Sequence, residues 1–315
     1  MTVTGSQGFR HEALFYAGEG GFLAGVVPFV RDAVAASEPI LIAVGEAKIR
    51  AIRADLGDRV PDGLVRFTEM GRLGRNPACI IPAWRDFVTE QGGRGRRIRG
   101  VGEPIWPSRS EAELVECHQH ESLLNLAFAG VTDFWLVCPY DAGALGPEVV
   151  VEAHRTHPVV TDGADRRASD VYAPPGTCPG TLEAALPKPA NEPAEFPFGR
   201  DGLTAVRRFV LDLAEHAGLE PERAADLVLA ASELATNSVL HGGGSGVVRV
   251  WQEDAELLCE VRDAGHIDEP LVGRERPTGH RSSGRGLWLV NQLCDLVQLR
   301  SFRTENVARL HMRLS

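Results

Sequence analysis

The sequence predicts a protein of two α/β domains joined by a proline-rich connector. The chain has 315 residues, which is enough for two domains at the usual ~100–200 residues each. Strand-like and helix-like runs alternate along the first half, and a different order of helices and hairpins follows in the last third. The stretch between them is rich in proline, alanine and glutamate and poor in large apolar residues. We therefore place the domains at residues 1–160 and 196–315, with a linker at 161–195.

The first domain is predicted to hold a mainly parallel sheet in a three-layer arrangement. Residues 39–45 (PILIAVG) and 132–140 (TDFWLVCPY) are short, apolar and bounded by turn residues, which is typical of buried strands. Residues 111–128 show helical spacing. One apolar face of that helix is expected to hold Leu114, Cys117, Leu124 and Phe128. Strands interleaved with helices indicate an α/β domain, and such sheets commonly bind ligands beyond the carboxyl ends of their strands.

The second domain has the pattern of a two-layer α/β sandwich. Apolar residues repeat at helical spacing from Leu203, and a second helix begins at Pro221, where a missing N–H costs nothing. That helix is expected to end at a run of three glycines. Residues 246–252 and 256–262 alternate like a β-hairpin. A helix over 284–295 and two further strand-like runs complete the chain.

Composition excludes several classes of function. The formal net charge is −10 and no long basic tract occurs, so we expect no direct nucleic-acid partner. The apolar runs fall short of the roughly 18 residues that a membrane helix needs, and the N-terminus lacks the pattern of a signal peptide. The six cysteines are scattered without a CxxC pair, which indicates reduced thiols in a cytoplasmic protein. No GxxxxGK[ST] loop is present.

Three segments of the second domain carry polar residues at informative spacing, and the first is ELATNSVLH. Glu233, Asn237 and His241 are each four residues apart, so they lie on one stripe of a helix. A carboxylate and an amide oxygen on one stripe could hold a hydrated Mg²⁺, which prefers hard oxygen ligands. A solvated polar face of an amphipathic helix explains the same pattern, and the segment alone favours that interpretation.

The second and third segments are EVRDAG and SSGRGLWLV. Asp263 follows an apolar strand, where it could accept a hydrogen bond from the exocyclic amine of adenine, and Gly265 would let the backbone approach a flat ring. An ordinary turn explains Asp and Gly equally well. Gly284 and Gly286 lead into a helix, whose first N–H groups and positive dipole end can bind phosphate.

Together and in this order, the three segments resemble the N, G1 and G2 boxes of the GHKL ATPases. That family includes histidine kinases, gyrase-type ATPases and anti-sigma serine kinases, and the resemblance covers roughly residues 196–315. It implies a Bergerat fold that binds ATP and Mg²⁺. It also implies that Glu233 is the general base, Asn237 the Mg²⁺ ligand with Glu233 acting through water, and Asp263 the adenine anchor. The other nucleotide contacts that it implies are Gly265, Arg281, Gly284, Arg285, Gly286 and Leu287.

The G1 segment departs from the family pattern at one position. Ile267 stands where the G1 box often carries a second glycine, which places turnover in question more than nucleotide binding. Residues 266–283 have the glycine content of a mobile lid, and their shortness fits the anti-sigma branch. Arg281 or Arg285 would neutralise phosphate charge, or either would be a solvent-exposed lid arginine.

The first domain resembles the MEDS sensory domain of bacterial regulators. The residues that carry the resemblance are HEALFY (11–16), GEPIWP (102–107), CHQHE (117–121), CPYD (138–141) and HRTHP (154–158). The match covers about residues 9–160. It implies a recombinase-like α/β fold without a working P-loop, and a domain that senses a small-molecule or protein signal.

The histidines of CHQHE and HRTHP do not predict a metal site. In CHQHE they lie two apart on an expected helix and point in different directions. In HRTHP they could share a face, but no third ligand is identifiable. Packing, hydrogen bonding or contact with an unknown ligand are the favoured roles. Cys117 and Cys138 are expected to be buried core thiols rather than redox sensors.

The sequence therefore favours a signal-responsive anti-sigma regulator. Its ATPase domain would sequester a sigma factor, phosphorylate Ser or Thr of a STAS-type antagonist, or do both, and the resemblance implies a homodimer. One alternative is a non-catalytic, ATP-dependent binding module. The other is a sensor histidine kinase, although a proline-rich linker stands where that class needs a phosphoacceptor hairpin.

Overall fold

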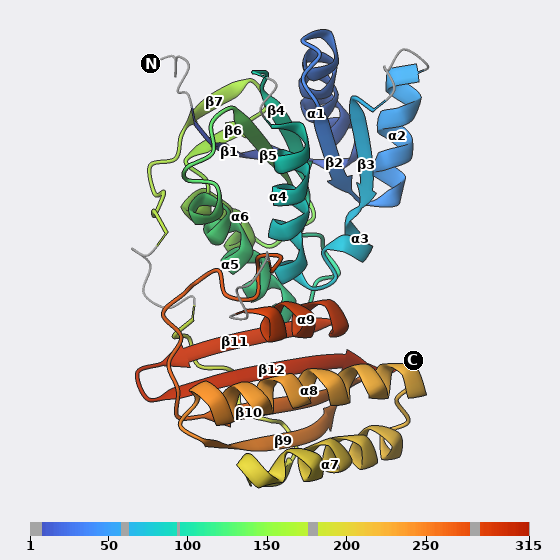
Figure 1. The fold of residues 1–315 in the computed structure, drawn as a ribbon. Coiled ribbons are helices and arrows are strands. Elements are labelled where there is room, and N and C mark those ends of the chain that lie inside the picture. The colour runs from blue at the N-terminus through green and yellow to red at the C-terminus, as the bar shows by residue number, and fades with distance from the viewer. Residues whose placement is uncertain (1–7, 58–62, 93–94, 176–181, 278–283, 315) are drawn as a thin grey trace. The chain divides into compact units, whose positions relative to one another are not determined.

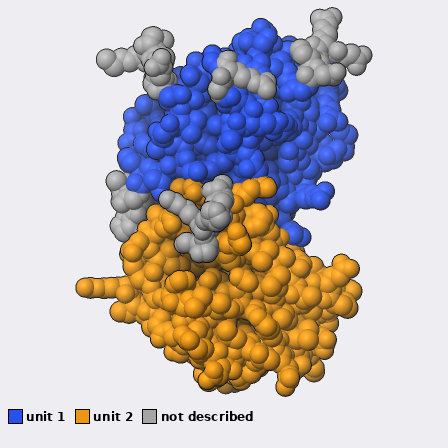
Figure 2. Space-filling view, in the orientation of Figure 1, with its two compact units in different colours: residues 1–178 blue, residues 179–315 orange. Residues whose placement is uncertain are grey.

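The computed structural model describes residues 8–57, 63–92, 95–175, 182–277 and 284–314. The chain divides into two compact units, residues 1–178 and 179–315 (Figure 2). The first contains a mainly parallel sheet and the second an antiparallel sheet with helices, which confirms the predicted fold class. Within the described residues, no helix combines the length and apolar character needed to cross a membrane.

The sheet of the first unit has seven strands in the order β3-β2-β4-β5-β1-β6-β7 (Figure 1). The strands are β1 Arg10–Tyr16, β2 Ile40–Val44, β3 Val65–Glu69, β4 Ile98–Gly102, β5 Phe134–Asp141, β6 Val159–Asp162 and β7 Asp165–Ala168. All neighbours are parallel except β6 and β7. The apolar runs at 39–45 and 132–140 supply β2 and β5, which are buried along nearly their whole length.

Helices cover both faces of this sheet and give it three layers. They are α1 Gly18–Ala35, α2 Glu46–Leu56, α3 Met70–Leu73, α4 Ile80–Gln91, α5 Glu111–Ala127 and α6 Pro147–Thr156, with a 3-10 turn at Pro77–Cys79. The helices α1 and α2 share an apolar core with β1, β2 and β4. Against the other face, α4 places Trp84 over β4, where a Cβ on Gly100 or Gly102 would come within 2.9 Å of the indole ring. Those two glycines therefore set how closely α4 approaches the sheet.

The buried face of α5 differs in part from the predicted one. The helix begins at a capping box formed by Ser110 and Glu113, close to the expected start. Leu114 is only half-buried. The buried face instead includes five polar side chains, Glu113, Glu116, Gln119, His120 and Glu121. A count of apolar residues could not identify this face, because partners on other elements are what allow polar groups to be buried.

The second unit is a five-stranded antiparallel sheet in the order β11-β12-β10-β9-β8, with helices on one face (Figure 1). The strands are β8 Ala194–Gly199, β9 Ser245–Glu253, β10 Glu256–Asp263, β11 Leu296–Phe302 and β12 Glu305–Arg313. The helices are α7 Leu203–His216, α8 Pro221–His241 and α9 Arg285–Leu293, with a 3-10 turn at Arg200–Gly202. Alternate residues of β10, such as Cys259 and Val261, face the helices and join one apolar core. The unit is the predicted two-layer sandwich.

The face of this sheet away from the helices is charged yet buried. Glu260 is 0% exposed and accepts hydrogen bonds from Arg249 Nη1 at 3.0 Å and Arg262 Nε at 2.7 Å. Arg309 donates to it from both Nε and Nη2, at 2.9 and 2.7 Å. Burial alone would raise the pKa of Glu260, but the hydrogen bond from Arg262 and the charge of Arg309 lower it. One carboxylate thus holds three guanidinium groups on this face.

Part of the predicted connector packs on that charged face. The range 161–195 includes β7 and the start of β8, so its ends belong to the two sheets. Between them, the carbonyls of Leu182 and Ala184 accept hydrogen bonds from the N–H of Ser301 and from Arg300 Nε. Proline lacks an N–H but keeps its carbonyl, and Pro187 O accepts from Arg309 Nη2 at 2.8 Å.

Replacing Glu260 with Ala is expected to destabilise the chain by about 3–5 kcal/mol, the usual cost of breaking a buried ion pair. The reason is that three arginines would keep their charge beside an empty site. Urea unfolding at neutral pH measures the change. The exposed Glu215 of α7 provides the control, because its replacement with Ala should change stability by only about 0.5 kcal/mol.

The same prediction has a pH dependence of defined sign. A carboxylate with a lowered pKa stabilises the fold only while it is ionised. The stability difference between the native chain and Glu260→Ala should therefore shrink as the pH falls through the folded-state pKa of Glu260. A difference that is small at neutral pH, or that grows with acid, would contradict the role given to this carboxylate.

Candidate functional site

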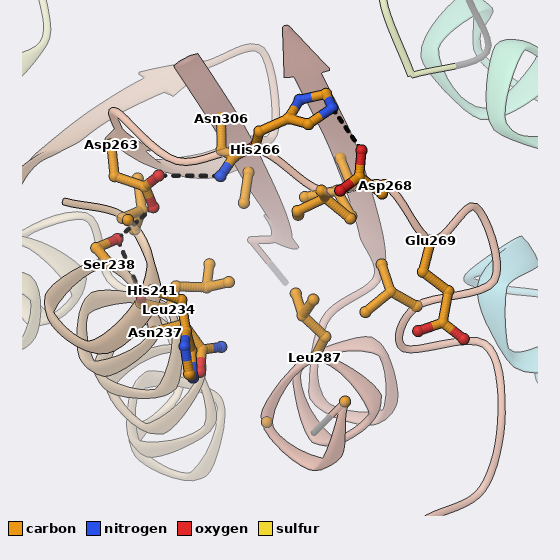
Figure 3. A pocket seen from close by; sticks show the side chains of 18 residues that line it. Leu234, Asn237, Ser238, His241, Asp263, His266, Asp268, Glu269, Leu287 and Asn306 are labelled. Atoms are coloured by element: carbon orange, nitrogen blue, oxygen red, sulfur yellow. Dashed lines mark hydrogen bonds and ion pairs between the residues drawn. The ribbon is translucent and has the colours of Figure 1, made fainter. Parts of the chain in front are cut away.

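The second unit contains a pocket of about 320 Å³ between α8, the start of α9 and the ends of β10 and β12 (Figure 3). Its polar wall is formed by Asn237, Ser238, His241, Asp263 and Asn306, and its apolar wall includes Leu234, Val261, Ile267, Val272 and Leu287. The pocket therefore combines an apolar side with a small number of hydrogen-bonding groups, which is the usual make-up of a small-molecule site.

Asp263 is the most constrained polar group of the pocket. It is the last residue of β10, and Ser238 Oγ donates to its Oδ2 at 2.7 Å. Its Oδ1 accepts from the N–H of Gly265 at 2.8 Å and from Asn306 Nδ2 at 3.0 Å. Gly242 leaves room for it, because a Cβ at that position would lie 2.4 Å from Asp263 Cγ. The carboxylate is thus fixed in the pocket wall with acceptor capacity left for a ligand.

Two of the residues that hold Asp263 were missed by sequence reasoning. Ser238 follows Asn237 directly on α8, and its hydroxyl faces the end of β10. Asn306 lies opposite Asp263 in the pairing of β10 with β12, so only the strand register could have revealed it. Asn306 Oδ1 accepts a hydrogen bond from Ser301 Oγ at 2.8 Å, which extends the network to β11.

Glu233 and Asn237 lie beside the start of α9. A Cβ on Gly286 would come within 2.9 Å of Glu233 Oε2 and 3.3 Å of Asn237 Nδ2. Gly284 is the N-cap of α9 with φ +86°, a conformation that glycine adopts at no steric cost. A carboxylate, an amide and the N-terminal end of a helix therefore converge. Asn237 and Gly286 line the pocket, whereas Glu233 is not among the residues that line it.

The remaining predicted contacts fall in different places. Gly284 and Leu287 line the pocket, and Gly265 contributes its N–H to Asp263. Arg285 is exposed and does not belong to the pocket lining. Arg281 lies outside the described residues, as does the rest of the segment 278–283.

The G1 departure places an apolar side chain in the pocket. Ile267 lines the cavity, and its N–H donates to Ser301 Oγ at 2.8 Å. His266, the residue before it, is exposed and pairs with Asp268 at 2.9 Å (Figure 3). The described part of the predicted lid, 266–277, thus forms one side of the pocket with its backbone anchored to β11.

These groups fit a bound nucleotide with its metal ion. Asp263 presents a fixed acceptor beside an apolar wall, as the exocyclic amine and ring of adenine require. The amide of Asn237 and the carboxylate of Glu233 are oxygen donors of the kind that Mg²⁺ takes. The close approach at Gly286 would be lost with any larger residue, and the N-terminal end of a helix is the kind of group that binds an anion.

The first unit places a separate polar cluster at the carboxyl ends of its strands. Tyr16 ends β1 and donates from its hydroxyl to Glu103 Oε1 at 2.5 Å. Lys48 Nζ lies 2.6 and 2.7 Å from the two carboxylate oxygens of Glu103. Burial raises the pKa of Glu103, although the charge of Lys48 opposes this. The cluster lies where parallel sheets commonly bind ligands.

Family comparisons agree with the division of the chain into two units. Residues 10–158 match the MEDS family, described as the methanogen/methylotroph, DcmR sensory domain, and residues 196–313 match the histidine kinase-like ATPase domain. No curated protein matches the chain closely enough to count as a relative.

Three solved structures are similar to part of the chain. The RsbU and RsbW domains of a Mycobacterium tuberculosis protein share 20% identity over 39% of this chain and 33% of that chain, with a TM-score of 0.31. The SiaB–SiaC complex of Pseudomonas aeruginosa shares 13% identity over 38% of this chain and 88% of that chain, with a TM-score of 0.31. The Acinetobacter baumannii histidine kinase AdeS shares 11% identity over 39% of this chain and 68% of that chain, with a TM-score of 0.24.

Likenesses of this size carry no information about substrates or partners. The two family matches, in contrast, coincide with the two units of the fold and with the pocket described above. The chain therefore joins a MEDS sensory domain to a histidine kinase-like ATPase domain.

Proposed function

We propose that the chain is a signal-responsive regulator whose second domain binds Mg-ATP. The observation that carries the proposal is the fixed carboxylate of Asp263, held by three donors across the pocket from the glycine-flanked start of α9. The family match implies a nucleotide-binding domain, and the pocket supplies groups for both the base and the phosphates.

Each residue of the pocket then has a defined task. Asp263 accepts a hydrogen bond from the adenine amine, and the apolar wall with Ile267 and Leu287 contacts the ring. Asn237 ligates the metal ion through its side-chain oxygen, with Glu233 acting through water. The first N–H groups of α9 bind the phosphates, and Arg281 or Arg285 neutralises phosphate charge.

We further propose that this site phosphorylates Ser or Thr of a STAS-type antagonist, or sequesters a sigma factor, under control of the first domain. ATP, when bound, supplies the phosphoryl group. Glu233 orients and activates the attacking hydroxyl, while positioning and charge neutralisation lower most of the barrier. The brevity of the segment 266–283 supports this branch. A homodimer and a cytoplasmic location are part of the proposal.

The described residues give little support to a sensor histidine kinase. That class needs an exposed phosphoacceptor histidine on a helical hairpin just before the ATPase domain. Residues 163–175 and 182–193, which precede β8, contain no helix. The sequence offers His118 or His120 of α5 beside an acid, but both lie in the α/β unit far upstream of the ATPase domain. His120 is 1% exposed, so a phosphoryl donor could not reach it without opening the first unit, whereas His118 is half-buried.

A non-catalytic binding module is the second candidate. Ile267 favours it, because its side chain lines the pocket at a position where a glycine would leave more space. In that case ATP would act as a switch ligand and the chain would work by sequestering a partner. Consumption of ATP on addition of a candidate partner separates the two candidates.

The experiment that tests the proposal is recovery of partners by the tagged full chain in Mg-ATP and, separately, in Mg-ADP. Cytoplasm from cells that express sigma factors and STAS proteins is the source, and mass spectrometry identifies what is retained. Nucleotide-dependent exchange between a sigma factor and a STAS protein is the expected result. Retention of neither protein in either nucleotide would overturn the anti-sigma assignment.

Replacement of Asp263 with Asn is expected to weaken the binding of ATP and of ADP alike, by roughly 10–150-fold. The reason is that a hydrogen bond to a charged group contributes about 1.5–3 kcal/mol. The substitution keeps the side-chain shape but turns an NH₂ group toward donors. Calorimetric titration measures both affinities. Asp212→Asn on the exposed side of α7 should bind normally, and unchanged binding by folded Asp263→Asn would remove Asp263 from the site.

Replacement of Asn237 with Ala is expected to abolish Mg-ATP-dependent phosphoryl transfer, while binding of ADP without Mg²⁺ changes little. The reason is that the amide serves the metal ion rather than the base. Transfer of labelled phosphate to a purified STAS protein is the measurement. Normal transfer by this variant would disprove the assigned metal position, and acid-labile label on the chain itself would instead favour the histidine kinase.

A further inference from the structure

Four side chains from distant segments meet in the interior of the first unit. His11 comes from β1, Glu121 from α5, Cys138 from β5 and His157 from the residue that follows α6. Each is at most 2% exposed, and one ligand atom of each lies within 4.8 Å of the other three. Each residue also belongs to one of four segments that carry the MEDS resemblance, HEALFY, CHQHE, CPYD and HRTHP.

Hydrogen bonds define which nitrogen of His157 carries the proton. Its Nδ1 lies 2.8 Å from the carbonyl oxygen of Ala153. A carbonyl can only accept, so Nδ1 must donate. In the neutral ring, Nε2 is therefore unprotonated, and it faces Glu121 Oε2 at 3.3 Å.

The same reasoning applies to His11. The Nδ2 group of Asn125 donates to the carbonyls of Thr156 and Glu121, at 2.8 and 3.3 Å. Asn125 therefore turns its oxygen toward His11 Nδ1, 3.1 Å away, and that nitrogen donates. His11 Nε2 is left with a lone pair that faces Glu121 Oε2 at 3.0 Å.

Two imidazole lone pairs and a carboxylate oxygen thus converge, and in the described residues the Cys138 thiol is the donor within hydrogen-bond distance of them. The thiol of Cys138 has one proton, and its sulfur lies 3.4 Å from His11 Nε2 and 3.5 Å from Glu121 Oε2. It can satisfy only one of the acceptors. Protonating both rings is unfavourable, because their centroids are 4.0 Å apart and two buried like charges repel. A proton on one ring or a metal ion would balance this arrangement.

Four of the six separations among the ligand atoms are close to the edges of a ligand tetrahedron, and the other two lie within 4.8 Å. Zinc bonds of roughly 2.0–2.3 Å to N, O and S imply ligand-to-ligand separations of about 3.3–3.7 Å. The four shorter separations, between Glu121 Oε2 and each of the other three ligand atoms and between Cys138 Sγ and His11 Nε2, run from 3.0 to 3.5 Å. Both rings also donate their other N–H to an oxygen, which is the arrangement that orients metal-bound histidines.

We propose that His11, Glu121, Cys138 and His157 bind one divalent transition-metal ion of the zinc type in the core of the first domain. Two imidazoles, a carboxylate and a thiolate form a mixed set that suits such an ion. Binding releases the Cys138 proton to solvent, because the thiolate is the ligand. The proposal is independent of the nucleotide site.

The test uses the full chain, stripped of metal with a chelator and titrated with Co²⁺ as a spectroscopic probe. A thiolate-to-cobalt charge-transfer band and the intense visible bands of tetrahedral Co²⁺ are expected to saturate at one equivalent and to disappear when Zn²⁺ is added. The nucleotide pocket has no cysteine in its lining, so it cannot produce the charge-transfer band. Absence of the band in the folded chain would overturn the proposal, leaving a shared proton as the cation.

Two variants and a matched control locate the ion. Cys138→Ser should lose the charge-transfer band, and His157→Gln should weaken the binding of Co²⁺ at least tenfold. Cys117→Ser should keep both properties, because that buried thiol lies outside the cluster and donates to Pro104 O. A band that survives in Cys138→Ser, or vanishes in Cys117→Ser, would place the ion elsewhere. Should a variant unfold, the band and stoichiometry of the native chain still decide the question.

Discussion

The pairing of β10 with β12 is the constraint on which the nucleotide site depends. It places Asn306 opposite Asp263, and the amide of Asn306 then fixes the carboxylate together with Ser238 and the N–H of Gly265. A slip of one residue would move Asp263 to the other face of the sheet. The helices, the pocket and the loop after β10 therefore depend on a strand register that the polar network itself reinforces.

The alternation of side chains along β10 explains why the second unit has only two layers. Cys259 and Val261 face the helices, whereas Glu260 between them faces the arginines of the neighbouring strands. A second helical layer would bury this charged face without enough acceptors. A proline-rich segment suits it better, because it offers backbone carbonyls, as Ala184 and Pro187 do, and few large apolar side chains. What reads as a linker thus also covers a charged surface.

Local patterns predicted most of the elements, and they named residues of α8, β10 and α9 that the structure brings to one pocket. The periodicity of apolar residues predicted β2, β5 and α8, and the spacing of glycines predicted the start of α9. In the structure that start lies close to Asn237. Patterns of this range could not reveal Asn306, which reaches the pocket through strand pairing. They also could not bring His157 together with His11, Glu121 and Cys138, because these three residues lie in segments far from it in the chain. Tertiary partners, rather than helical spacing, decide which polar residues are buried.

Strand β1 connects the two polar clusters of the first unit. His11 points to the face covered by α5 and α6, and Tyr16, an odd number of residues away, points to the face covered by α1. Both clusters hold buried charge beside β1. The free energy of each cluster would therefore change if a cation or another ligand bound there. A signal can shift a domain only by binding one conformation better than another. β1 is the element that contributes a residue to both clusters, His11 to one and Tyr16 to the other.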